Sequence, residues 1–411
     1  MRLSQKLVFV LLATCFFACK KEKEPAIPVT DPCEGIAIQG SPLKTNWTLA
    51  ELFANVADHP FVYGNQVICS KWGGTYFHEL IGINKQTGMQ EWKVKVPGPF
   101  LAIYAKVQGN QMYWIDQYTR QFVSFDLDLH TFKTLWTPDS TAVFVSPEFQ
   151  LVQGGALLEV VYQYNMDIKR VAVLEKIDFQ QHTSTVLYQA DQFFNDYTRE
   201  GFWGLQLTTN AAGDTLAVFI NTMYIINFGN LSILLAINTK YKKVEHEFTL
   251  PNALYSDISA LVVKDGQACI GFNIDEVRGN ILNFDLKKGI QTFAITTNDM
   301  IGVQWAGGKI IAYDDNATYA FQADSGDKIW QNGGSMYNPV DANFSWFDLD
   351  GRLFMVRNHQ LVQLDLETGC TLKSQAIEYA SEYNEVVTIQ KDPLDNVIYI
   401  RLQEQMLGVQ L

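Results

Sequence analysis

Histidine, serine and glycine motifs are the obvious places to look for chemistry, but in this chain none has a catalytic pattern. No two histidines stand at the spacing of metal ligands, and no glycine-rich loop opens a helix to hold a phosphate. The G-x-S-x-G motif of a nucleophilic serine is also missing. The six histidines are His59, His78, His130, His182, His246 and His359. The sequence therefore predicts no catalytic, cofactor-binding or metal-binding residue.

Acidic residues offer two further candidates for chemistry. Residues 348–351 (DLDG) match the beginning of a calcium loop, but Gln360 or Leu361 stands where the bidentate glutamate is required. We therefore interpret this segment as a turn. Asp299 and Glu385 are candidates for a general base, but nothing in the sequence distinguishes them from solvated loop residues.

Aromatic residues outside any repeat could stack on the C–H faces of a sugar. These residues are Trp203, Trp305, Tyr337 and Trp346. Trp203 lies in the longest insertion, where Tyr197 and Phe202 complete a candidate binding surface. The alternative for each of these rings is packing in the core.

Composition and charge limit the classes to which the protein can belong. The chain has 411 residues, of which 47% are hydrophobic and 13% aromatic, so it can bury a large core. Its net charge of −13 argues against nucleic acid as a partner and against electrostatic adhesion to anionic lipid.

The first residues match an export signal. Arg2 and Lys6 precede an apolar stretch, residues 7–18, that is shorter than the roughly 20 residues that span a bilayer. The sequence FFAC, which ends at Cys19, resembles a bacterial lipoprotein cleavage box. Residues 1–18 are thus expected to be a signal peptide, Cys19 the lipidated residue and residues 19–43 a flexible tether. This pattern resembles outer-membrane lipoproteins of the Gram-negative envelope, either periplasmic or surface-facing; the alternative is an ordinary signal followed by soluble export.

Four cysteines follow the leader. Cys69 and Cys269 lie in apolar strands and are expected to be buried thiols. Cys33 precedes the strand that should close the fold, and Cys370 begins an outer strand nearby. A Cys33–Cys370 disulfide is therefore a hypothesis for an exported chain.

A repeat runs along almost the whole chain and decides the fold class. An apolar strand ends in an acidic or amide residue, called here the anchor residue, and a polar turn then leads to a strand with an aromatic. The anchor residues are Asn84, Asp126, Asp178, Asn238, Asp285, Gln322, Asp365 and Gln410. Successive spacings of 42, 52, 60, 47, 37, 43 and 45 residues, with several short strands per unit, predict an all-β propeller of four-stranded antiparallel blades.

The spacing from anchor to aromatic supports the repeat. It is 8 residues in units one, five and six and 10 in units two, three and four, so the aromatic stays on one face of its strand. The aromatics are Trp92, Trp136, Tyr188, Phe248, Phe293 and Trp330, with Leu372 in the seventh unit.

The eighth unit ends at Leu411 before its outer strand. Residues 44–49 (KTNWTL) look like an outer strand, so we expect Trp47 to supply the eighth aromatic and close the ring in the last blade. Two alternatives stay open: a seven-bladed ring with residues 44–49 apart, and a short helix over residues 48–57.

The repeat resembles that of pyrroloquinoline-quinone-type (PQQ-like) β-propellers over most of residues 44–411. That resemblance implies a structural role for Asn84, Thr87, Gly88, Trp92, Ser325, Gly326, Trp330, Asp365, Thr368 and Gly369. The superfamily contains quinoprotein dehydrogenases as well as a non-enzymatic lipoprotein of the outer-membrane β-barrel assembly machinery. The adjacent cysteines of the large dehydrogenases are missing here, which favours the non-enzymatic branch.

Together these patterns predict an envelope lipoprotein that binds a protein partner without a cofactor and without catalysis. The docking surface is expected on the face that carries the insertions at 141–170 and 191–230, because recognition usually lies in loops on a rigid scaffold. A carbohydrate-binding surface lipoprotein is the first alternative, and a quinoprotein-type dehydrogenase is the second.

Overall fold

The computed structural model describes the chain except at a set of segments. These segments are residues 1–32, 34–39, 41–42, 51–58, 73–77, 97–103, 165–168, 191–200, 226–228, 251–257, 276–277, 299, 315–316, 334–345, 358, 379 and 381–385. The chain divides into a short first unit, Met1–Ile36, and a compact second unit, Ala37–Leu411, which contains every strand. Among the described residues, no helix is long and apolar enough to cross a membrane.

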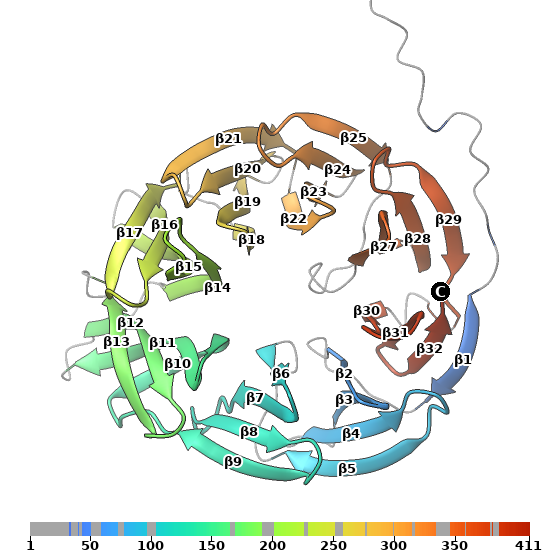
Figure 1. Ribbon diagram of the computed structural model, residues 1–411, viewed down its shortest axis with the longest axis horizontal. Coiled ribbons are helices and arrows are strands. Elements are labelled where there is room, and N and C mark those ends of the chain that lie inside the picture. The colour runs from blue at the N-terminus through green and yellow to red at the C-terminus, as the bar shows by residue number, and fades with distance from the viewer. Residues whose placement is uncertain are drawn as a thin grey trace, which may run out of the picture. The chain divides into compact units, whose positions relative to one another are not determined.

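The second unit is built from eight four-stranded antiparallel sheets, which are arranged as blades around a ring (Figure 1). Blade 1 contains β2 (Phe61–Tyr63), β3 (Gln66–Trp72), β4 (His78–Asn84) and β5 (Gln90–Val96). Blade 2 contains β6 (Lys106–Gln108), β7 (Gln111–Ile115), β8 (Phe122–Asp126) and β9 (Thr131–Trp136). Blade 3 contains β10 (Ala142–Val152), β11 (Gly155–Tyr164), β12 (Lys169–Asp178) and β13 (Thr183–Gln189). Blade 4 contains β14 (Gly201–Thr209), β15 (Thr215–Ile225), β16 (Gly229–Asn238) and β17 (Lys243–Thr249).

The second half of the chain continues the same pattern. Blade 5 contains β18 (Ile258–Lys264), β19 (Gln267–Asp275), β20 (Arg278–Asp285) and β21 (Ile290–Thr297). Blade 6 contains β22 (Met300–Ala306), β23 (Lys309–Asp314), β24 (Ala317–Gln322) and β25 (Lys328–Gly333). Blade 7 contains β26 (Trp346–Leu349), β27 (Arg352–Arg357), β28 (Gln360–Asp365) and β29 (Thr371–Ala376). Blade 8 contains β30 (Val386–Lys391), β31 (Val397–Leu402), β32 (Met406–Gln410) and, as its outer strand, β1 (Lys44–Leu49).

The ring closes as the sequence predicted. Strand β1 pairs antiparallel with β32, so the N-terminal strand completes the last blade, and Trp47 lies opposite Gly408 (Figure 1). The all-β, eight-bladed prediction is confirmed, and the seven-bladed alternative is wrong. Burial follows the same symmetry: eight apolar clusters of described residues each join two neighbouring blades.

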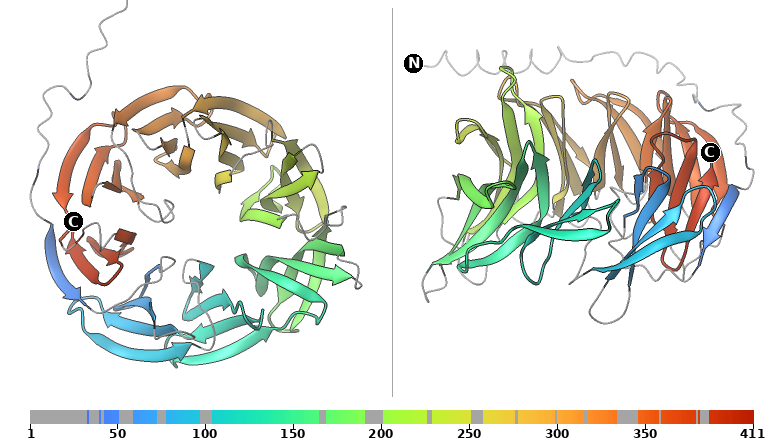
Figure 2. Two further views of the ribbon diagram at one scale, coloured as in Figure 1. Left: turned by 180° about the vertical axis from the view of Figure 1, so that it is seen from behind. Right: turned by 60° about the horizontal axis from the view of Figure 1, so that its bottom comes forward.

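The antiparallel order gives the ring two different faces (Figure 2). The anchor face carries the turns that follow the anchor residues, together with the turns between first and second strands. The crossover face carries the connections between second and third strands and the passages from blade to blade. Because Lys44 pairs with Gln410, β1 begins at the anchor face.

The anchor residues shape their turns through one repeated arrangement. In blade 1, the Asn84 side-chain oxygen accepts the backbone N–H groups of Gln86 and Thr87 at 3.0 and 3.1 Å. The anchors of blades 2, 3, 4, 5 and 7 accept two N–H groups in the same way. Such side-chain bonds fix a turn locally, which explains the preference for Asp and Asn at these positions.

The fourth residue after each anchor has a positive φ wherever the chain continues that far. Four of these residues are glycines: Gly88, Gly289, Gly326 and Gly369. The other three are His130, His182 and Lys242, with φ between 54° and 56°. Two of the six histidines therefore occupy anchor turns, a role that the sequence pattern did not show.

In blades 1, 2, 6 and 7, the anchor turn receives the outer-strand aromatic of the preceding blade. The Trp47 Nε1–H donates to the Lys85 carbonyl at 2.8 Å, and the Trp330 Nε1–H donates to the Leu366 carbonyl at 3.0 Å. A Cβ on the turn glycine would lie 2.6 Å from the Trp47 ring at Gly88 and 2.4 Å from the Trp330 ring at Gly369. Only glycine accommodates both this approach and the positive φ.

The shift from 8 to 10 residues between anchor and aromatic has a simple structural basis. Trp92 and Trp330 pair opposite the residue two positions before the anchor, whereas Tyr188 and Phe248 pair opposite the residue four positions before it. Both positions lie on the same face of the third strand, because side chains alternate with period two. The prediction that the aromatics share a face is confirmed.

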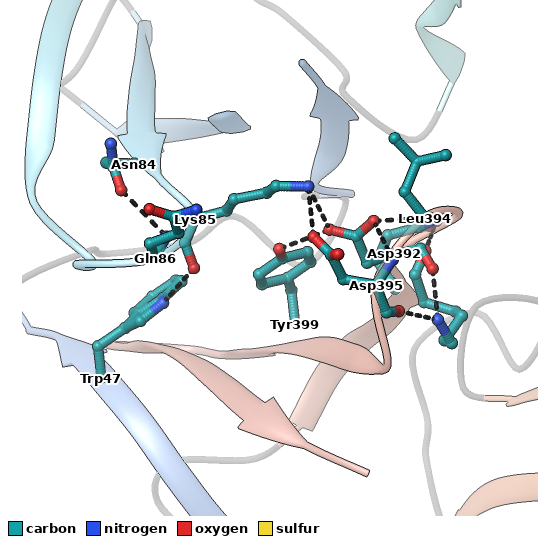
Figure 3. Close-up of polar contacts among 10 residues, drawn as sticks. Trp47, Asn84, Lys85, Gln86, Asp392, Leu394, Asp395 and Tyr399 are labelled. Atoms are coloured by element: carbon teal, nitrogen blue, oxygen red, sulfur yellow. Dashed lines mark hydrogen bonds and ion pairs between the residues drawn. The ribbon is translucent and has the colours of Figure 1, made fainter. Parts of the chain in front are cut away.

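A buried ion pair joins the last blade to the first at the closing seam (Figure 3). The Lys85 ammonium lies 3.2 Å from the fully buried Asp392 carboxylate and 2.7 Å from that of Asp395. Tyr399 donates its hydroxyl to Asp392 at 2.8 Å. Burial alone would raise the pKa of Asp392, but hydrogen bonds from the Leu394 N–H, Tyr399 and Lys85 hold it below its usual value.

The described cysteines fall into two kinds. Cys69 and Cys269 are buried free thiols, as expected, and burial raises the pKa of Cys269. Cys33 and Cys370 are each disulfide-bonded. The pairing of these two with each other stays a prediction.

Trp47→Ala should destabilise the propeller by about 3–5 kcal/mol, because it removes a buried ring and its hydrogen bond at the closing seam. Trp47→Phe should cost less, since most of the ring contact survives. The free energy of unfolding in urea measures both losses. Lys373, and not Leu372, pairs opposite the residue two positions before the anchor of blade 7, so the expected equivalence of Leu372 with the outer-strand aromatics is wrong. Leu372→Ala, in the outer strand of blade 7, therefore serves as the control with a smaller expected loss. Equal losses of unfolding free energy for Trp47→Ala and Leu372→Ala would contradict the expectation that the Trp47 contact contributes more to stability.

Candidate functional site

The residues singled out for chemistry are dispersed or structural. Among the described residues, no three His, Cys, Asp or Glu side chains come close enough to hold a metal ion. The turn at 348–351 connects β26 and β27, with positive φ at Asp350 and Gly351, and the Asp348 carboxylate accepts the Gly307 N–H at 3.1 Å. The turn interpretation of this segment agrees with this geometry. Asp299 and Glu385 lie outside the described residues.

The candidate aromatic surface does not come together as an exposed platform. Phe202 is buried and packs against Phe219, with the two rings tilted and their centroids 4.4 Å apart. Trp203 packs against the cluster between blades 4 and 5, and Trp346 is buried between blades 6 and 7. Tyr197 lies outside the described residues. These positions favour the packing alternative for the rings that the structure describes.

Blades 3 and 4 extend furthest on the crossover face. The β11–β12 ladder continues to the Tyr164–Lys169 pair, beyond the Ala142–Tyr162 pair at the start of β10. The β15–β16 ladder likewise continues to the Ile225–Gly229 pair, beyond Gly201 at the start of β14. The two insertions noticed in the sequence therefore lengthen neighbouring hairpins on one face.

Three exposed apolar side chains lie beside these tall blades on the same face; they are called here the crossover patch. They are Tyr118, Val143 and Phe144, with exposed fractions of 66, 36 and 44%. The patch spans two blades that are held together locally, because the Arg120 guanidinium donates to the Ala142 carbonyl. The Asp116 carboxylate accepts the Tyr118 and Thr119 N–H groups at 2.9 and 3.1 Å. The patch is thus presented by an ordered turn, which carries Tyr118, and by the first residues of β10, which carry Val143 and Phe144.

Blade 3 holds the first strand of blade 4 through side chains that reach its backbone. The Glu159 carboxylate accepts the Phe202 N–H at 3.0 Å, and the Glu148 carboxylate accepts the Gly204 N–H at 3.0 Å. Gln150 donates its side-chain amide to the Leu205 carbonyl. These three contacts fix the relative position of the two tall blades.

Glu159 is an unusual member of this seam, because it is a buried acid. Burial raises its pKa to about 8, with a smaller contribution from the Glu148 charge, while the bond from the Phe202 N–H opposes the shift. Burial likewise lowers the pKa of Lys106, and Glu148 opposes that shift. The sequence offered no indication of this group, because its burial depends on packing between blades.

Comparison with known proteins identifies the class of fold. No protein-family model and no curated protein sequence matches the chain. Three similar solved structures are a computationally designed protein called Ika8, Sqt1 of Saccharomyces cerevisiae and the Dos1 propeller. Ika8 matches with TM-score 0.58 at 11% identity, covering 90% of this chain and 98% of its own. Sqt1 matches with TM-score 0.58 at 10% identity, covering 91% and 98%. The Dos1 propeller matches with TM-score 0.54 at 9% identity, covering 90% and 95%. At these identities, the likeness shows the β-propeller fold alone.

Glu159→Gln should make the protein more stable at alkaline pH. The native pKa of about 8 lies above the ordinary 4.5, so the native state keeps a proton that the unfolded chain releases. Stability from this group is complete below pH 4.5 and is lost progressively as the pH rises to about 8. Glutamine still accepts the Phe202 N–H and does not ionise, so the gain should reach a few kcal/mol near pH 8, at about 1.4 kcal/mol per pKa unit.

Urea unfolding of both proteins from pH 4.5 to 9 measures this effect. Glu91→Gln, which alters an exposed carboxylate, is the control. Parallel stability curves for the parent protein and Glu159→Gln would show that Glu159 does not bind a proton in the native state.

Proposed function

We propose that this chain is an outer-membrane lipoprotein whose propeller docks another protein of the cell envelope without catalysing a reaction. The observation that carries the proposal is the crossover patch, where Tyr118, Val143 and Phe144 remain exposed beside the tallest blades. Single exposed apolar residues are common on protein surfaces, but two exposed rings and a valine on an ordered turn and strand have the composition of an interface core.

The structural role of the repeat supports a scaffold. Anchor carboxylates and amides are occupied by turn N–H groups, and the Trp47 and Trp330 indoles bond to neighbouring turns. These residues fix the geometry of the ring, and none of them is free to act on a substrate. A rigid ring loses little entropy on binding, which favours a docking function.

The direction of β1 supports an anchored orientation. The strand begins at the anchor face, so the chain upstream of Lys44 joins the ring on the side opposite the crossover patch. A lipid on Cys19 would then leave the crossover face open to a partner. The resemblance of residues 1–19 to a lipoprotein leader and of the repeat to the non-enzymatic PQQ-like branch is consistent with this arrangement.

Tyr118→Ser combined with Phe144→Ser should reduce recovery of the partner by about tenfold or more, because it removes the exposed rings at the centre of the patch. The measurement is quantitative recovery of cross-linked envelope proteins with the tagged, full chain. Met89→Ser with Leu129→Ser, two exposed apolar residues on the anchor face, is the matched control. Changes at such exposed positions alter stability by only about 0.5 kcal/mol. Equal recovery with both double variants would contradict docking at this patch.

Cys19→Ser should abolish incorporation of labelled fatty acid and release the chain from the membrane fraction. The physical reason is that the acyl chains attach only through the sulfur of this cysteine, and each buried CH₂ group contributes about 0.8 kcal/mol to anchoring. Metabolic labelling followed by gel fluorography measures the change. Cys15→Ser is the control because it alters the competing cysteine of the leader. Continued labelling of Cys19→Ser would exclude this residue as the lipidation site.

A further inference from the structure

Exposed lysines gather on the anchor face of blades 4 and 5, although the whole chain is acidic. They come from the turn after Asn238, from the turn after Asp285 and from the end of β18. The cluster, called here the lysine patch, consists of Lys240, Lys242, Lys243, Lys264, Lys287 and Lys288. The sequence separates these lysines by up to 48 residues, so the patch is a product of the fold.

Packing between the blades brings the three turns together. A Cβ on Gly289 would lie 2.8 Å from the His246 ring, so the blade 5 anchor turn abuts β17 of blade 4. The Lys287 side chain crosses Gly266, where a Cβ would lie 2.5 Å from its Cε, and this contact joins the turn after β18. The lysines therefore form one continuous surface.

Part of the positive charge is not neutralised by neighbouring acids. Lys240 pairs with Asp214 at 3.1 Å, and Lys288 pairs with Asp285 at 2.8 Å. Within the part of the chain that the structure describes, no ion pair is recorded for Lys242, Lys243 or Lys287. These three ammonium groups lie in solvent, where anionic groups of a partner can reach them.

Exposed apolar side chains lie among the lysines. Tyr241 is 57% exposed and Ile290 is 49% exposed. The Lys240 and Lys243 ammonium groups lie 4.9 and 5.7 Å from the centre of the Tyr241 ring. A ring and an aliphatic side chain surrounded by ammonium groups have the composition of a surface that meets lipid headgroups and the acyl boundary.

We propose that the lysine patch binds the anionic headgroups of a membrane surface. This inference rests on the proposed lipid anchor. Because β1 begins at the anchor face, an anchored tether joins the ring on the face that carries the lysine patch. Charge complementarity selects the ligand: ammonium groups near a membrane favour phosphate-bearing anionic lipids, at roughly 1 kcal/mol for each lysine.

The net charge of −13 does not oppose this contact once the propeller is at the membrane. Charges further apart than the Debye length of about 8 Å at physiological salt are largely screened. Acidic groups further than this from the lipid contribute little, whereas the exposed lysines of the patch would lie within this distance of the headgroups. Contact through the patch holds the anchor face against the lipid and turns the crossover patch outward.

The test uses a chain that begins at Lys20, so that lipidation plays no part. The compact unit begins at Ala37, so this chain keeps the whole propeller. Sedimentation should show binding to phosphatidylcholine vesicles that contain phosphatidylglycerol, and little binding to phosphatidylcholine alone. Lys242→Gln with Lys243→Gln and Lys287→Gln should weaken binding about tenfold to a hundredfold. Lys93→Gln with Lys133→Gln and Lys373→Gln, three lysines of other blades, is the control of equal charge and should bind as the parent chain does.

Three results would overturn the proposal: equal binding to both kinds of vesicle, no binding to either, or equal weakening by the two triple variants. Binding to polyglutamate that depends on the patch, without such dependence for vesicles, would instead assign the patch to an acidic protein. Fatty-acid labelling of Cys19 is measured separately. Failure of the lipid anchor and failure of the lysine patch are therefore distinguishable.

Discussion

The contact between an outer-strand aromatic and the anchor turn of the next blade is the interaction on which this propeller depends at the seams that lead into blades 1, 2, 6 and 7. At Trp47 and Trp330 it combines an indole hydrogen bond with ring packing over a glycine of positive φ. The anchor side chain fixes its own turn through hydrogen bonds. The aromatic of the neighbouring blade therefore packs against a rigid turn. At these seams the contact is local, but it sets the angle between the two blades that it joins.

This interaction explains why the fold could be predicted from the sequence and where the prediction stopped. Anchor residues, turn glycines and aromatics recur at regular spacings along the sequence. The number of blades and the role of Trp47 in closing the ring could therefore be predicted. His130, His182 and Lys242 occupy the positions where the other anchor turns have glycine, so the positive φ in blades 2, 3 and 4 could not be predicted from the residue type. A histidine or lysine with positive φ adds conformational strain to the turn, and contacts with neighbouring residues compensate for it. No sequence pattern indicates where such compensation occurs.

The candidate surfaces were only partly predictable, because they arise from contacts between blades. The insertions at 141–170 and 191–230 lengthen two neighbouring blades, but Phe202 is buried, and the exposed rings beside these blades are Tyr118 and Phe144. Packing between blades decides which of these rings is buried, and the local sequence does not show that packing. The lysine patch was missed for a related reason. The net charge is a sum over the whole chain, so it does not reveal a cluster of lysines that come from turns far apart in the sequence.

The closing seam links the architecture to these surfaces. Lys85 and Asp392 form a buried ion pair, and such pairs add little net stability, although an unpaired partner is costly. A β1 strand in the wrong register would misplace Trp47 and the turn that carries Lys85, leaving Asp392 buried without its counterion. The pair therefore selects the correct closure. Correct closure also fixes the face from which the N-terminal chain joins the ring, and this gives the two faces of a nearly symmetric ring different surroundings.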